Sequence, residues 1–88
     1  MKCVKIILLP TGSEPLSRFS VMQAAYSCGA QGCVSKGSHK ALLIEAEGSD
    51  VQVAEFLKSL SGWSFWIKSQ IVEVVESDVK HYKGFNII

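Results

Sequence analysis

Two cationic side chains, Arg18 and Lys36, are of the types that bind anions. Arg18 follows a turn-rich stretch and opens a predicted helix, and Lys36 ends the strand predicted after that helix. A guanidinium fork matches two phosphate oxygens, and an ammonium attracts a phosphate or a carboxylate by its charge. The amide dipoles of a helix N-terminus add to that attraction. The competing interpretation is that both are ordinary solvated surface residues.

Side chains suited to nucleophilic or metal chemistry are sparse. Ser17 and Ser20 lie close to Arg18, but no His–Asp pair supports a serine nucleophile. The two histidines, His39 and His81, are far apart in sequence, and no Cys-x-x-Cys motif is present. We therefore expect no metal and no cofactor.

The three cysteines, Cys3, Cys28 and Cys33, have no framework spacing. An odd count argues against a secreted disulfide scaffold. We expect three free, small, buried side chains in a reducing compartment, and a Cys28–Cys33 redox pair is the alternative.

The elements that would position Arg18 are a strand and a helix. Residues 3–9 are β-branched and apolar, which predicts a central strand, and residues 11–15 are rich in turn formers. A helix is expected over residues 16–28, with Ser13 or Glu14 serving its N-terminus and Gly29 ending it. Its apolar stripe consists of Leu16, Phe19, Met22 and Tyr26.

A hairpin is expected to position Lys36. Residues 32–36 and 39–47 alternate as strands, and Gly37–Ser38 predicts a tight two-residue turn between them. Lys36, His39 and Lys40 form a basic cluster at its tip, which is either a polar turn or a tip that binds an anion or responds to pH.

A second helix should begin at Ser49, because Ser49 and Gln52 resemble a capping box, and should end near Ser61. Residues 67–76 and 85–88 read as further strands. The buried stripe of this helix comprises Val53, Phe56, Leu57 and Leu60.

The order of elements is β-α-β-β-α-β with a short extra C-terminal strand. It predicts a ferredoxin-like α+β sandwich, in which two helices cover one face of an antiparallel sheet. The chain has 88 residues, of which 48% are hydrophobic and 19% charged, and we expect a single domain over residues 1–88.

The overall charge and hydropathy limit the partners. A net charge of +1 gives no global attraction to nucleic acid or to an anionic membrane, and the strands lack a basic-aromatic motif for RNA. The apolar run from Ile6 to Pro10 is too short for a signal peptide core or a membrane span. We expect a cytoplasmic protein, monomeric or weakly dimeric.

Residues 62–66 are unusually aromatic for the loop that they are expected to form. Trp63, Phe65 and Trp66 either cap the core or form an exposed patch that binds a protein partner.

Several short motifs give the chain a resemblance to the acylphosphatases. They are Arg18 after the turn-rich loop, Ala25-x-x-x-Gly29-x-x-Gly32-Cys33-Val34, Ile44-x-Ala46-Glu47-Gly48, Val53-x-x-Phe56-Leu57-x-x-Leu60 and a closing Tyr82-x-x-Phe85-x-Ile87. The resemblance covers nearly the whole chain without large gaps, and it implies the same sandwich fold.

The resemblance also implies a site. In the acylphosphatases, loop amides and one Arg hold the phosphoryl group, and an Asn orients the attacking water, without a metal. Arg18 matches that Arg, so the implied anion-binding residues are Gly12, Ser13, Leu16 and Arg18. Lys36 stands where the Asn belongs, so Arg18 and Lys36 are the candidate catalytic residues.

The chain departs from the family pattern at that site. Lys36 accepts no hydrogen bond, so it cannot orient water as a carboxamide oxygen does. Pro15 removes an amide donor from the implied cradle, and Glu14 adds a negative charge. We therefore expect a small-anion-binding or protein-interaction module with weak or no hydrolysis of acyl phosphates. The alternative is an active acylphosphatase, in which Lys36 acts electrostatically and Ser13 or a loop carbonyl orients the water.

Overall fold

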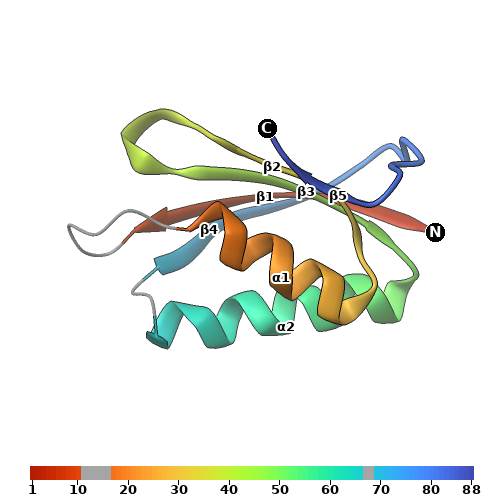
Figure 1. The fold of residues 1–88 in the computed structure, drawn as a ribbon, viewed down its shortest axis with the longest axis horizontal. Coiled ribbons are helices and arrows are strands. Elements are labelled where there is room, and N and C mark those ends of the chain that lie inside the picture. Colours follow the sequence, from red (N-terminus) through yellow and green to blue (C-terminus); the bar gives the residue numbers. More distant parts are fainter. Residues whose placement is uncertain (11–16, 67–68) are drawn as a thin grey trace.

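The computed structural model describes residues 1–10, 17–66 and 69–88 of the chain. Its elements are β1 (Lys2–Pro10), α1 (Arg18–Cys28), β2 (Gln31–Lys36), the short 3₁₀ helix η1 (Ser38–Lys40), β3 (Leu42–Gly48), α2 (Asp50–Trp66), β4 (Ser69–Ser77) and β5 (Phe85–Ile87). The strands form one sheet in the order β4-β1-β3-β2-β5, and both helices cover the same face of it (Figure 1). The predicted ferredoxin-like sandwich is confirmed.

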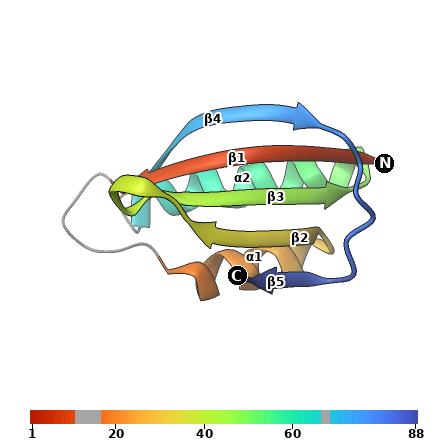
Figure 2. The same ribbon diagram turned by 90° about the horizontal axis from the view of Figure 1, so that it is seen from above.

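The sheet is mixed, whereas the sequence led us to expect an antiparallel one. The pairs β1–β3, β1–β4 and β2–β3 are antiparallel, and β1 is central as predicted. The short strand β5 runs parallel to β2. The reason is the path of residues 78–84, which cross from β4 at one edge of the sheet to the opposite edge (Figure 2).

Alternation along the strands gives the sheet two different faces, with one register irregularity in the β1–β4 pair between Ile7 and Leu8. The face under the helices carries the strand residues of the core: Val4, Ile6, Leu8, Val34, Leu42, Ile44 and Ala46. The opposite, open face carries the intervening residues, among them Lys5 and Ile7 of β1 and Leu43 and Glu45 of β3.

Helix α1 buries a different stripe from the one expected. Phe19 and Tyr26 are 56% and 58% exposed, and the buried residues are Val21, Ala24 and Ala25. Small side chains on the buried side allow a helix to approach its neighbours closely, so residue size outweighs hydrophobicity here. Met22 packs at the edge of the core.

The ends of α1 are set by local hydrogen bonds. The Ser17 hydroxyl caps the helix by accepting a hydrogen bond from the Ser20 N–H at 3.2 Å, a role expected for Ser13 or Glu14, which lie outside the described residues. Gly29 ends the helix in the left-handed conformation, as predicted.

Helix α2 starts as predicted and ends later. The Ser49 N–H donates to the Gln52 side chain at 2.9 Å, and the Gln52 N–H donates to the Ser49 hydroxyl at 3.1 Å. Of the expected stripe, Val53, Phe56 and Leu60 are buried, and Leu57 is partly buried. The helix continues to Trp66.

The aromatic stretch 62–66 is therefore helical rather than a loop. A single glycine inside a helix costs only about 1 kcal/mol, so Gly62 alone does not end it. The side chains of Trp63, Phe65 and Trp66 lie outside the described part of the structure.

The connection between β2 and β3 is longer than the predicted two-residue turn. The Gly37 N–H donates to the Ala41 carbonyl at 2.8 Å, and η1 lies between them. His39 and Lys40 both adopt positive φ values, of 56° and 62°. Strand β3 consequently begins at Leu42 rather than at His39.

Candidate anion-binding site

Arg18 is the first residue of α1 and is half-buried. The first turn of the helix contains no acidic residue, so no carboxylate there offsets the positive end of the helix dipole. The Arg18 Nη1 group donates a hydrogen bond to the backbone carbonyl of Ile88 at 3.1 Å. This contact joins the start of α1 to the residue that follows β5.

Ile88 in turn connects Arg18 to strand β2. The Ile88 N–H donates to the Val34 carbonyl at 2.9 Å, which extends the parallel pairing of β5 with β2. Figure 2 shows the start of α1 and the ends of β2 and β5 at the same end of the molecule. Two successive hydrogen bonds thus link Arg18 through Ile88 to Val34, which precedes Lys36 by two residues in β2.

Lys36 is the last residue of β2 and is exposed. Alternation along β2 places it on the same face as buried Val34, which is the face that the helices cover. Lys36 therefore projects toward the layer of helices to which Arg18 belongs, at the same end of the molecule. Both side chains carry positive charge, and neither accepts a hydrogen bond.

The remaining residues of the predicted site cannot be placed. Gly12, Ser13 and Leu16, together with Glu14 and Pro15, lie outside the described residues. The basic cluster at the hairpin tip is placed: His39 and Lys40 are exposed in η1, directly after the end of β2.

A buried carboxylate on the open face of the sheet is not among the residues predicted for the site. Glu47 of β3 is fully buried, and it accepts backbone hydrogen bonds from Lys80 at 2.6 Å, His81 at 3.1 Å and Tyr82 at 2.8 Å. Burial alone would raise the pKa of Glu47, but these three N–H donors outweigh it and hold the pKa below its usual value. Glu47 thereby fixes the path of residues 80–82 across the sheet.

A second carboxylate, Glu45, lies two residues earlier on the same face. Its Oε2 atom accepts a hydrogen bond from the Tyr82 hydroxyl at 2.7 Å and forms a salt bridge with the Lys80 ammonium at 2.8 Å. Burial acts to raise its pKa, and the bonds from Lys80 and Tyr82 lower it to a net value below the usual one. Burial and the bond to Glu45 raise the pKa of the Tyr82 hydroxyl.

One signal for this cluster was visible in the sequence. Glu47 lies in the Ala46-Glu47-Gly48 motif, on the same strand face as Leu43 and Glu45. Alternation indicates which face such a residue takes, but its burial depends on a segment more than thirty residues later. The polar atoms of this cluster hydrogen-bond one another, so we interpret its role as structural: it holds residues 80–82 in place.

The cysteines are free and make separate contacts. Cys3 is buried next to the Ser77 hydroxyl at 3.4 Å, Cys28 approaches Ser59 at 3.9 Å, and Cys33 donates to the Tyr82 hydroxyl at 3.8 Å. Burial is complete only for Cys3, so the expectation of three buried thiols holds for one of them. The described residues contain no cluster of three or more His, Cys, Asp or Glu side chains suited to a metal, and none of their helices is long and apolar enough to cross a bilayer.

The strand order, the two helices on one face and the short parallel strand β5 define a ferredoxin-like α+β sandwich. Comparison with solved structures shows that this sandwich is the acylphosphatase fold. The chain superposes on acylphosphatase from Bacillus subtilis with a TM-score of 0.80 and 20% identity, over 100% of this chain and 99% of that one. For an acylphosphatase from Coxiella burnetii the values are 0.72 and 20%, over 99% and 92% of the two chains.

The fold is also similar to part of a larger protein. The structure of full-length HypF in the phosphate- and nucleotide-bound form matches with a TM-score of 0.72 and 26% identity, over 99% of this chain and 12% of that one. The sequence matches no protein-family model and no curated protein.

Proposed function

We propose that this acylphosphatase-like domain binds a small anion, such as phosphate or an acyl phosphate, and hydrolyses acyl phosphates weakly or not at all. The observation that carries the proposal is the arrangement of Arg18 and Lys36. Arg18 lies at the N-terminus of α1 and is connected to β2 through Ile88. Exposed Lys36 ends β2 and projects from the face of the sheet that the helices cover. Both donate hydrogen bonds and carry positive charge, which favours anion binding.

The same arrangement argues against efficient hydrolysis. In-line attack on a phosphoryl group requires a side chain that orients the attacking water. The Lys36 ammonium can donate a hydrogen bond to that water, but it cannot accept one from the water O–H. Glu14 and Pro15, in the stretch before Arg18, further reduce the attraction and the number of amide donors available to a dianion.

Two measurements test the proposal. Inorganic phosphate is titrated into the ¹⁵N-labelled chain at fixed ionic strength, and benzoyl phosphate hydrolysis is followed by absorbance. We expect saturable binding that weakens about tenfold or more in Arg18→Ala, since a charge-assisted hydrogen bond contributes about 1.5–3 kcal/mol. Lys58→Ala, at an exposed lysine of α2, is the matched control and should leave binding unchanged.

The outcome of the hydrolysis assay decides between two functions. Turnover in the range of ordinary enzymes, about 1–10³ s⁻¹, that is abolished by Arg18→Ala would overturn the proposal. It would establish the alternative, an active acylphosphatase in which Lys36 stabilises the transferring phosphoryl group. The shared fold and the presence of Arg18 favour that alternative, and it requires activity to be lost in Lys36→Ala as well.

Two further parts of the proposal concern a protein partner and the cellular compartment. A protein-interaction role through Trp63, Phe65 and Trp66 is compatible with anion binding, and substitution of these three residues by Ala would remove it. A reducing compartment such as the cytoplasm is proposed because all three cysteines are free.

A further inference from the structure

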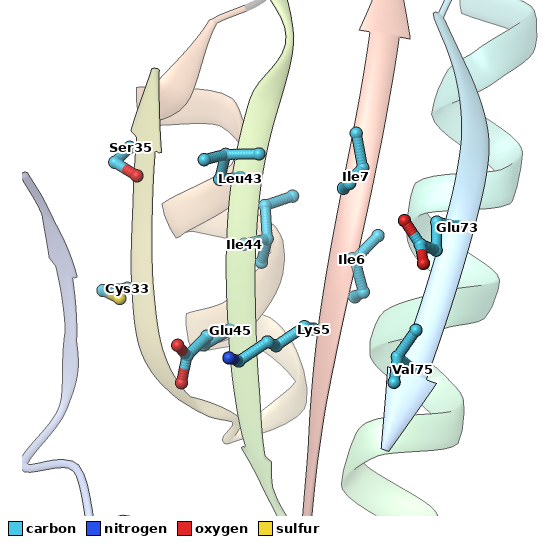
Figure 3. Close-up of a pocket in the computed structure, with 10 residues that line it drawn as sticks. All are labelled: Lys5, Ile6, Ile7, Cys33, Ser35, Leu43, Ile44, Glu45, Glu73 and Val75. Atoms are coloured by element: carbon cyan, nitrogen blue, oxygen red, sulfur yellow. The ribbon is translucent and has the colours of Figure 1, made fainter. Parts of the chain in front are cut away.

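The open face of the sheet contains a hollow unrelated to the Arg18 region. It has a volume of about 390 Å³ and lies over β1, β2, β3 and β4 (Figure 3). The helices cover the opposite face, and residues 80–82 cover the end of the open face at Glu47 and contact Glu45 and Cys33 at the edge of the hollow. The rest of the hollow lies over the part of the sheet that they leave uncovered.

The strand registers arrange the residues of this hollow in two rows across the sheet. One row runs Val75, Lys5, Glu45, Cys33, and the next runs Glu73, Ile7, Leu43, Ser35. Each row thus combines apolar and charged positions, and the two charged residues of β1 and β4 are diagonal neighbours.

Part of the hollow is apolar and open to solvent. Leu43 is 42% exposed and Val75 is 46% exposed, and the half-buried Ile7 lies between them on the central strand. Contiguous apolar side chains around a hollow, rimmed by charges, are typical of an interaction surface. Burying these three side chains against a partner would stabilise the complex, because their apolar surface is in contact with water in the monomer.

The charges on this surface are of both signs. Glu45 is held by Lys80 and Tyr82, so it belongs to the cluster described above. Lys5 and Glu73 are exposed, and within residues 1–10, 17–66 and 69–88 neither forms a salt bridge. The Lys5 ammonium points toward Glu45 and helps to lower the pKa of that carboxyl (Figure 3). Lys5 stays exposed, and Glu73 lies diagonally across the strand pair from it.

We propose that the open face is a homodimer interface, in which Ile7, Leu43 and Val75 of two copies pack together and Lys5 of each copy pairs with Glu73 of the partner subunit. A two-fold interface uses the same surface twice, so it requires that surface to complement itself. One lysine, one glutamate and a shared apolar centre meet this requirement. A charged partner of a single sign would satisfy Lys5 or Glu73, but it would repel the other.

The dimer should be weak. A standard interface buries about 800 Å² on each partner, and the uncovered part of this face offers only a few exposed side chains. Over protein concentrations from about 10 μM to about 1 mM, we therefore expect the dimer to form mainly toward the upper end. Reversing the charge of Lys5 or of Glu73 should weaken the dimer about tenfold or more. The change occurs in both copies, so two like-charge contacts replace two ion pairs.

Sedimentation equilibrium of the full chain tests the proposal. Lys5→Glu and Glu73→Lys should each weaken the dimer, and the double variant Lys5→Glu/Glu73→Lys should restore it, because both ion pairs re-form with reversed polarity. The control is Glu55→Lys/Lys58→Glu, at exposed positions of α2 on the other side of the molecule. It should dimerise like the wild type.

Three outcomes overturn the dimer. They are a wild type that stays monomeric over the whole range, single reversals that have no effect, and a double reversal that fails to restore association. Circular dichroism of each variant separates loss of association from loss of folding, and the double variant keeps the test valid where a single one unfolds. Phosphate binding near Arg18 is measured separately, so this inference and the proposed function fail independently.

Discussion

Arg18 and Ile88 are seventy positions apart in the sequence, yet the Arg18 Nη1 group donates to the Ile88 carbonyl at 3.1 Å. The bond holds the guanidinium against the end of β5 and restricts its orientation. It occupies one of the five N–H donors of arginine, so the fork retains others for a ligand. Ile88 is thereby part of the framework that positions the candidate anion clamp.

Replacing Arg18 by lysine should weaken phosphate binding although the charge is kept. A lysine has three donors on one atom and cannot bond Ile88 and two phosphate oxygens with the geometry of a planar fork. We expect an affinity loss of about five- to tenfold in Arg18→Lys, smaller than in Arg18→Ala, by calorimetry with inorganic phosphate. Equal affinities for Arg18→Lys and the wild type would mean that only net charge matters.

Restoring the carboxamide at residue 36 should change catalysis and binding in opposite directions. In Lys36→Asn the side chain can accept a hydrogen bond from water, so benzoyl phosphate hydrolysis should rise above that of the wild type. Phosphate binding should weaken, since one positive charge is lost. An inert Lys36→Asn variant would show that the stretch before Arg18 also prevents hydrolysis, whereas lost activity would favour the enzyme alternative.

The fold could be predicted from the sequence where local patterns decide the structure. Alternation in residues 42–46 identified the buried face of β3, and the Ser49–Gln52 capping box marked the start of α2. The same reasoning failed for α1, because side-chain size rather than hydrophobicity decided which residues were buried. Phe19 and Tyr26 have larger apolar surfaces than Ala24 and Ala25, but they are exposed.

The site was predictable only in part, because several of its contacts join distant segments. No periodicity indicates that Arg18 bonds Ile88 or that Glu47 is enclosed by residues 80–82. The parallel direction of β5, which produces both arrangements, depends on how residues 78–84 cross the sheet. Resemblance supplied Arg18 and Lys36 as candidates, and the structure adds what holds Arg18 in position.

Gly32 is expected to tolerate no side chain. It has a φ of 144°, and a Cβ atom built there would lie 1.8 Å from the Glu45 carbonyl oxygen of the paired strand. Because that neighbour is backbone, Gly32→Ala must separate β2 from β3 or change the local conformation. We expect a loss of about 3 kcal/mol or more in the free energy of unfolding, measured in urea.

Gly84 provides the matched control for this substitution. Its φ of 78° is also positive, but a Cβ atom there would meet nothing within 4 Å. Gly84→Ala should therefore cost only the backbone strain, about 1 kcal/mol. Equal losses in the two variants would contradict the steric explanation.

Neutralising Glu47 should destabilise the fold far more than neutralising a surface glutamate. Glu47→Gln places an amide group among three N–H donors, so one of its own donors is left facing another donor. We expect a loss of about 2–3 kcal/mol in the free energy of unfolding. Glu76→Gln, which removes the exposed 3.4 Å salt bridge to Lys2, should cost no more than about 1 kcal/mol. Similar losses would show that the buried bonds contribute little.

The same carboxylates should make stability depend on pH below the ordinary glutamate range. The pKa values of Glu47 and Glu45 are lowered in the folded chain from 4.5, so the unfolded chain binds protons first as the pH falls. Their contribution is complete above pH 4.5 and is lost as the pH drops through the folded values. Urea unfolding from about pH 7 to about pH 3 should show this fall, and Glu47→Gln should reduce its slope. An unchanged slope in that variant would mean that groups other than Glu47 control acid unfolding.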